Sequence, residues 1–217
     1  MLELELNIHD FHKCGKFAKS IVEKENQFNR MNEPDGLRRF RTFLGKTGEL
    51  YIHKYNHFLK ENNFDNFIYI NEMFEIYPGI TNVDEADFLF KNLTVDIKTI
   101  YASNHKNIVI PTDQPIKDIY IGVKVHTNNE WLSNDFHKKS ENWGKNTKAM
   151  FRDITKFSCL GFIEREKVET CQIKSEYGNS AYFVPLNLFN KNPNELEKIL
   201  SSLVPARQEN KQKILVK

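Results

Sequence analysis

The stretch that most constrains the fold of this chain is residues 87–98, with the sequence Asp-Phe-Leu-Phe-Lys-Asn-Leu-Thr-Val-Asp-Ile-Lys. Its two β-prone apolar runs flank Lys91-Asn92, a natural two-residue hairpin turn. A hairpin closed by this turn places Asp87 opposite Asp96, with Cβ atoms roughly 5 Å apart. Because strand side chains alternate between two faces, Lys98 shares a face with Asp96. The predicted register pairs Phe90 with Leu93, Leu89 with Thr94 and Phe88 with Val95.

Two opposed carboxylates repel each other, and a divalent cation between them would remove that repulsion. Mg²⁺ prefers oxygen ligands and keeps several waters, so Asp87, Asp96 and the backbone carbonyl of Ile97 form a candidate Mg²⁺ site. The metal would polarise a phosphodiester and lower the pKa of an attacking water, which Lys98 would orient or assist by stabilising the transition state. The alternative is an ordinary hairpin with surface charges, in which Glu85 pairs with Lys98 across the strands.

An Asp, a hairpin of this length and then Asp-x-Lys together resemble the signature of the PD-(D/E)xK nuclease superfamily. The resemblance implies a restriction-endonuclease-like α/β (α+β) core, in which helices flank a central mixed β-sheet. It also implies that Asp87 and Asp96 bind the metal and that Lys98 is catalytic. The chain departs from the signature at Ala86, where the family has a proline without a chemical role. Asp84 competes for the place of the first acid, but the predicted register turns it to the other side of the hairpin.

Residues 48–62 predict an amphipathic helix, because apolar residues recur on one side at helical spacing. Many members of the superfamily carry a Glu on such a helix that reaches the metal site, and the resemblance implies this role for Glu49. Glu49, His53 and His57 follow at four-residue intervals, opposite the apolar face. Such a row can bind a transition metal, so a zinc-dependent hydrolase of another substrate is one alternative. A solvated or DNA-facing helix edge is the other.

The remaining pattern predicts one α/β domain with added segments. We expect residues 1–44 to form an N-terminal helical extension, residues 45–204 the nuclease core and residues 205–217 a flexible basic tail. Besides the hairpin, the predicted strands are 117–125, 157–163 and 181–186, and the predicted helices outside the core helix are 9–31, 164–169 and 194–203.

Charge and cysteine content limit the possible partners. The 217 residues carry a net charge of only +2, so nucleic-acid binding requires local basic patches. Three cysteines without metal-type spacing, and the absence of an apolar run of about 20 residues, favour a cytoplasmic protein that does not insert into a membrane. The candidate DNA contacts are Arg38, Arg39 and Arg41 ahead of the core helix, and Lys138, Lys139, Lys145 and Lys148 in the basic stretch 137–156.

The sequence therefore predicts a Mg²⁺-dependent DNA endonuclease, with Mn²⁺ as a substitute metal, of a restriction type or encoded by a phage. Cleavage of both DNA strands normally requires two active sites, so a homodimer is expected. Junction-resolving and repair nucleases use the same core, and a non-catalytic nucleic-acid-binding module is the alternative from another class.

Overall fold

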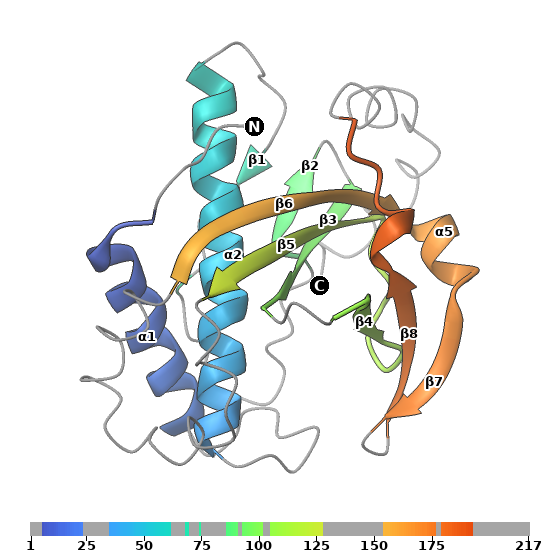
Figure 1. The fold of residues 1–217 in the computed structure, drawn as a ribbon, viewed down its shortest axis with the longest axis horizontal. Coiled ribbons are helices and arrows are strands. Elements are labelled where there is room, and N and C mark those ends of the chain that lie inside the picture. Colours follow the sequence, from blue (N-terminus) through green and yellow to red (C-terminus); the bar gives the residue numbers. More distant parts are fainter. Residues whose placement is uncertain are drawn as a thin grey trace, which may run out of the picture.

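The computed structural model describes residues 6–23, 35–61, 68–69, 74, 86–90, 93–101, 105–127, 154–176 and 179–192. In this part of the chain, helices and two β-sheets form a mixed α/β structure, which confirms the general fold class (Figure 1). The predicted helix 194–203 and tail 205–217 lie outside the described residues. None of the described helices combines the length and the apolar character needed to cross a membrane.

Two long helices precede the sheets. Helix α1 (Ile8–Glu23) begins at a reciprocal cap, in which Asn7 Oδ1 accepts a hydrogen bond from the Asp10 amide at 3.1 Å and Asp10 Oδ2 accepts one from the Asn7 amide at 2.7 Å. Helix α2 (Asp35–Glu61) starts well before the predicted residue 48. The reason is that Phe40, Phe43 and Leu44 continue the helical apolar spacing and are buried. The predicted boundary between residues 44 and 45 therefore falls inside α2.

The first sheet has five strands in the order β1-β2-β3-β5-β6. Strand β3 runs parallel to β5, and the other neighbours are antiparallel. The hairpin β2–β3 has the predicted register, and the strands predicted at 117–125 and 157–163 are confirmed as β5 and β6. The strands are β1 (Ile68–Tyr69), β2 (Phe88–Phe90), β3 (Leu93–Ile100), β5 (Ile119–Thr127) and β6 (Ile154–Glu164).

The second sheet has the order β4-β8-β7 and is antiparallel throughout. Strand β8 (Asn179–Pro185) and helix α5 (Arg165–Glu169) confirm the elements predicted at 181–186 and 164–169. Strands β4 (Asn107–Pro111) and β7 (Gln172–Glu176) were not predicted. Both lie at the edges of their sheet, and residues 172–175 of β7 are exposed, so this strand lacks the alternation of apolar and polar residues that reveals a half-buried strand.

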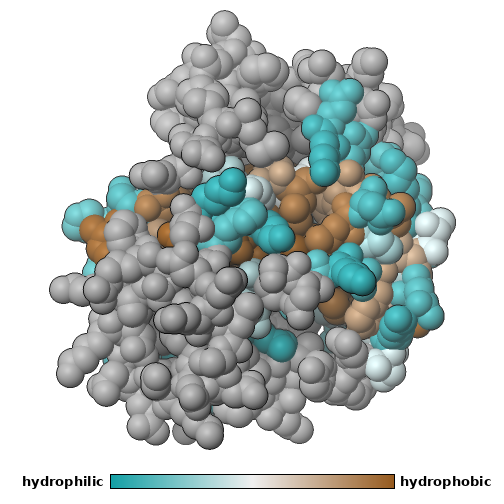
Figure 2. All heavy atoms as spheres, viewed as in Figure 1, coloured by the Kyte–Doolittle hydropathy of each residue, from teal (hydrophilic) through white to brown (hydrophobic). Residues whose placement is uncertain are grey.

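The first sheet separates two apolar clusters. One of its faces packs against α1 and α2 and carries Val95 and Ile97, whereas Tyr120 on the opposite face belongs to the cluster formed with the second sheet. Because side chains alternate along a strand, Asp96 and Lys98 lie on the face that carries Tyr120. Figure 1 shows α1 and α2 on one side of the molecule and the second sheet on the other. Figure 2 shows hydrophobic and hydrophilic side chains side by side on the viewed face of the described residues.

Helix α2 approaches β3 closely at Gly48. A Cβ atom at this position would lie 2.0 Å from Thr99 Oγ1, so the contact requires a glycine. Glu49 is the next residue of the helix. The close approach therefore brings Glu49 to the sheet beside the strand that carries Asp96 and Lys98.

Candidate active site

Asp87 stands immediately before β2 and is tied to β3 by a hydrogen bond. The amide of Ile97 donates to Asp87 Oδ2 at 2.6 Å. Ile97 is the residue between Asp96 and Lys98, so this bond holds the Asp87 carboxylate beside both of them. The Ile97 amide thus holds Asp87 in the place opposite Asp96 that the hairpin register predicts. The sequence pattern alone did not indicate this hydrogen bond.

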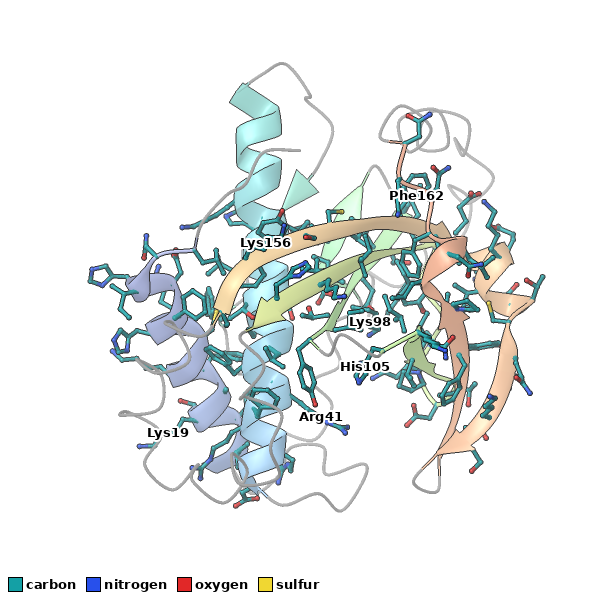
Figure 3. The ribbon with its side chains drawn as sticks, viewed as in Figure 1. Lys19, Arg41, Lys98, His105, Lys156 and Phe162 are labelled. Carbon is teal, nitrogen blue, oxygen red and sulfur yellow. The ribbon has the colours of Figure 1, made fainter. Side chains whose placement is uncertain are left out.

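Asp96 and Lys98 form an ion pair on β3, the central strand of the first sheet. Lys98 Nζ lies 2.6 Å from Asp96 Oδ2, and the two side chains are 25% and 16% exposed. Burial opposes the charge of Lys98, but the charges of Asp96 and Asp87 outweigh this effect and raise the pKa of Lys98 above its usual value. Lys98 is therefore a cation at neutral pH. Figure 3 shows it near the middle of the molecule.

The environment of Asp87 disfavours its charged form. Burial raises the pKa of Asp87 well above the usual value, and the nearby charges of Glu49 and Asp96 raise it further. The hydrogen bond from the Ile97 amide and the charge of Lys98 act in the opposite direction but are weaker. Glu49 of α2 and Asp96 of β3 therefore both act on the carboxyl group of Asp87, which stands just before β2.

Glu49 reaches the site from α2 as part of a buried ion pair. Lys46 Nζ lies 2.5 Å from Glu49 Oε2, and the two side chains are only 10% and 13% exposed. Lys46 Nζ also lies 4.9 Å from the centroid of the Phe17 ring of α1. The edge of α2 that carries Glu49 is thus buried against α1 and the sheet, although it is opposite the apolar face predicted from the sequence.

The donors at this site fit Mg²⁺ with few protein ligands. Within the described ranges, no group of three His, Cys, Asp or Glu side chains is arranged to hold a metal ion. Asp96 Oδ2 is buried and lies 2.6 Å from Lys98 Nζ, so a cation bound here would share this oxygen with Lys98 or displace it. Asp87 and Asp96 would be the protein ligands, with the Ile97 carbonyl as the predicted third and water in the other positions, as is usual for Mg²⁺.

The predicted histidine row is only partly described. His53 is half-buried on α2, and the side chain of His57 lies outside the described residues. The alternative zinc site built on Glu49, His53 and His57 therefore stays a prediction. Glu49 itself is engaged with Lys46 and acts on the Asp87 carboxylate.

The first basic patch belongs to the beginning of α2 and is less accessible than predicted. Arg38 pairs with Asp35 at 3.3 Å and is 16% exposed. Arg39 is also partly buried, whereas Arg41 is exposed (Figure 3). Of these three arginines, Arg41 is thus the candidate DNA contact. The predicted contacts Lys138, Lys139, Lys145 and Lys148 lie outside the described residues.

Two residues near the site were not predicted. Tyr120 is the partner of Asp96 in the parallel register of β3 and β5, and its hydroxyl accepts a hydrogen bond from the Lys117 amide at 2.9 Å. The sequence could have indicated Lys46, because it lies three residues before Glu49, a spacing that allows an ion pair on a helix. Tyr120 was not detectable, because the sequence does not reveal how β3 and β5 are aligned.

Comparisons with protein families, with curated proteins and with solved structures found no significant match to this chain.

Proposed function

We propose that this chain is a Mg²⁺-dependent endonuclease of the PD-(D/E)xK, restriction-endonuclease-like class, and that it hydrolyses phosphodiester bonds in DNA. The observation that carries this proposal is the grouping of Asp87, Asp96 and Lys98. The Ile97 amide binds Asp87 at 2.6 Å, and Lys98 Nζ lies 2.6 Å from Asp96. The signature residues of the resemblance thus lie together on one part of a mixed sheet that is flanked by a long helix.

Each residue has a distinct chemical role in this proposal. Asp87 and Asp96 would hold the metal, which when bound supplies charge stabilisation at the phosphate and a more acidic water. Lys98, which carries its proton at neutral pH, donates to the attacking water or to a non-bridging phosphate oxygen and so stabilises the additional negative charge. Glu49 acts from one side as an outer acidic partner, and Lys46 fixes its position.

The class of DNA substrate follows from the resemblance alone. A restriction-type or phage-encoded enzyme would cut duplex DNA at discrete sites, whereas a junction-resolving or repair nuclease would prefer branched or damaged DNA. Two-strand cleavage would involve a homodimer with one site per subunit. Comparing plain duplex with four-way junctions as substrates separates these possibilities.

A non-catalytic nucleic-acid-binding module is the second candidate. It is favoured by the finding that Glu49 and Asp96 each already have a lysine partner, so the described acids are partly neutralised by the protein itself. Such a module would bind DNA without cutting it, and its binding would be insensitive to Mg²⁺.

The test is cleavage of supercoiled plasmid in Mg²⁺, in Mn²⁺ and in EDTA. We expect metal-dependent cutting by the wild type, and losses of at least about a hundredfold in rate for Asp96→Ala and Lys98→Ala, because each removes several kcal/mol of transition-state stabilisation. Glu166→Gln on α5 and Lys16→Ala on α1 are matched controls, since both side chains are exposed. Thermal unfolding of each variant verifies folding. Equal cutting by all variants, or no cutting by the folded wild type, would overturn the proposal.

A further inference from the structure

Two aromatic rings lie beside each other at the point where β3 ends. Tyr101 follows Ile100, the last residue of β3, and its ring centroid lies 5.5 Å from that of the His105 imidazole. The Tyr101 ring also meets the ring of Phe40 on α2 in a T-shaped contact, with centroids 5.2 Å apart and planes at 82°. We call Tyr101 and His105 the ring pair.

The ring pair is anchored to the core and still reaches solvent. Phe40 is only 2% exposed, and Tyr101 packs against the same apolar cluster between the first sheet and the two long helices. Tyr101 itself is half-buried, whereas His105 is exposed. Two residues before Tyr101, Thr99 makes the close contact with Gly48 of α2. The place of the Tyr101 ring is therefore set by packing, so a ligand would not have to order it on binding.

The ring pair lies close to the candidate active site along the chain of β3. Tyr101 is three residues after Lys98, so their Cα atoms are roughly 10 Å apart by strand geometry. A stacked DNA strand advances about 3.4 Å per nucleotide, so this span corresponds to about three nucleotide steps. A base within a few nucleotides of a phosphate at Asp96 and Lys98 is therefore within reach of the ring pair.

A ring pair at this place suits a nucleobase whose face is uncovered. In a duplex each base is paired and stacked inside the helix, and a protein reaches mainly phosphates and base edges. In a single strand or at a branch, the faces of the bases are uncovered, and aromatic side chains stack on them with little dependence on sequence. The phenol ring of Tyr101 and the imidazole ring of His105 thus match the second kind of ligand.

We propose that the ring pair stacks on an unpaired base close to the phosphodiester that is cut. The substrate would then be DNA with unpaired nucleotides, such as a single strand, a flap or a branch point, rather than continuous duplex. This inference rests on the proposed function for the cutting step and deepens it by naming the substrate class. Because stacking tolerates any base, the ring pair would select the structure of the DNA and not its sequence.

The test compares the binding of DNA with and without unpaired bases. Fluorescence anisotropy in EDTA measures Kd for a labelled single strand of about 16 nucleotides, for the duplex of the same sequence, and for a strand of equal length built from abasic sites, which keeps the phosphates but lacks the bases. The variants are Tyr101→Leu/His105→Ala, His105→Ala alone and Tyr101→Phe. His9→Ala is the matched control, because His9 is an exposed histidine on α1.

We expect Tyr101→Leu/His105→Ala to bind the single strand at least about tenfold more weakly than wild type, with unchanged Kd for the duplex and the abasic strand. His105→Ala should show part of this loss, whereas Tyr101→Phe and His9→Ala should bind like wild type. Tyr101→Phe keeps the ring against Phe40, and His105→Ala removes an exposed side chain, so neither change should disturb the fold.

Equal weakening for all three ligands, or unchanged binding of the single strand by the double variant, would overturn the inference. Tighter binding of the duplex than of the single strand by the wild type would also overturn it, and metal-dependent plasmid cutting would then leave the nuclease proposal intact. A wild type that binds single strands through the ring pair but never cuts would support the stacking site and refute the nuclease. A wild type that neither binds nor cuts DNA would refute both.

Discussion

At the candidate site, burial and the charges of Glu49 and Asp96 all oppose the charged form of Asp87. The opposition of Asp87 and Asp96 was predictable from the length of the hairpin and its turn, because strand pairing is local once the turn is known. The Ile97 amide that holds Asp87 and the Glu49–Lys46 pair that faces it were not predictable in this detail. They depend on side-chain packing between α2 and the sheet, and the sequence pattern carries no information about that packing.

Replacing Asp87 by Asn should stabilise the metal-free protein. The raised pKa means that the folded protein holds this proton to a higher pH than the unfolded chain, whose Asp titrates near about 3.9. Stability is therefore lost as the pH rises from that value through the folded pKa. In EDTA at pH 7, we expect Asp87→Asn to raise Tm by about 2–4 °C, the shift that about 1 kcal/mol produces at this size. A lower Tm than that of wild type would contradict this explanation of Asp87, and the exposed Glu166→Gln serves as the control.

Cys14 should be the least reactive of the three thiols. Burial, and then the charges of Glu49 and Asp10, raise its pKa to about 12. The thiolate is the reactive form, so Cys14 should resist alkylation by iodoacetamide at pH 8 until the protein unfolds. Peptide mass spectrometry after labelling in buffer and in urea measures this for each cysteine. Native labelling of Cys14 as fast as of the partly exposed Cys171 would show that the α1–α2 contact is not formed as described.

At the scale of elements, local periodicity predicted more than long-range pairing. The hairpin, β5, β6, α5 and β8 were all predicted, because each has a turn signal or an apolar pattern within its own sequence. The predicted start of the core helix at residue 48 was wrong, because the buried Phe40, Phe43 and Leu44 extend the apolar side of α2 toward its N-terminus. Strands β4 and β7 escaped notice because they are short edge strands, and their pairing with β8 spans distant parts of the chain.

Two glycines of α2 provide a matched test of how the helix meets the sheet. Gly48→Ala places a Cβ atom 2.0 Å from Thr99 Oγ1, whereas Gly45→Ala meets nothing within 4 Å. Alanine favours a helix over glycine by up to about 1 kcal/mol, so Gly45→Ala should be stabilising by about 0.5–1 kcal/mol. Gly48→Ala should instead be destabilising by about 1–3 kcal/mol, because overpacking outweighs helix propensity.

Urea unfolding measures the change in the free energy of unfolding for each of the two substitutions. Adding Thr99→Ala to Gly48→Ala removes the overlapping oxygen and should recover part of the lost stability. Equal stabilisation by Gly45→Ala and Gly48→Ala would mean that α2 does not approach β3 at this point. The position of Glu49 beside the hairpin would then lose its support.

At the scale of the whole molecule, the two faces of the first sheet pack against different elements. One face of the first sheet packs against α1 and α2, and the other face carries the candidate active site and packs against the second sheet. The sequence predicted the general α/β class, and its choice of site residues stays a prediction. It did not predict how β4 and β7 pair with β8 in the second sheet, and so it did not show what packs on the face that carries the candidate site.

Plasmid cleavage by Asp87→Asn beside the wild type in Mg²⁺ is the most direct test of the proposed nuclease activity. This variant keeps an oxygen for the Ile97 amide and is expected to be the more stable protein, so a loss of activity cannot be ascribed to unfolding. We expect the wild type to cut and Asp87→Asn to cut at least about a hundredfold more slowly. Equal rates for the two proteins, or no cutting by the wild type, would contradict the proposal.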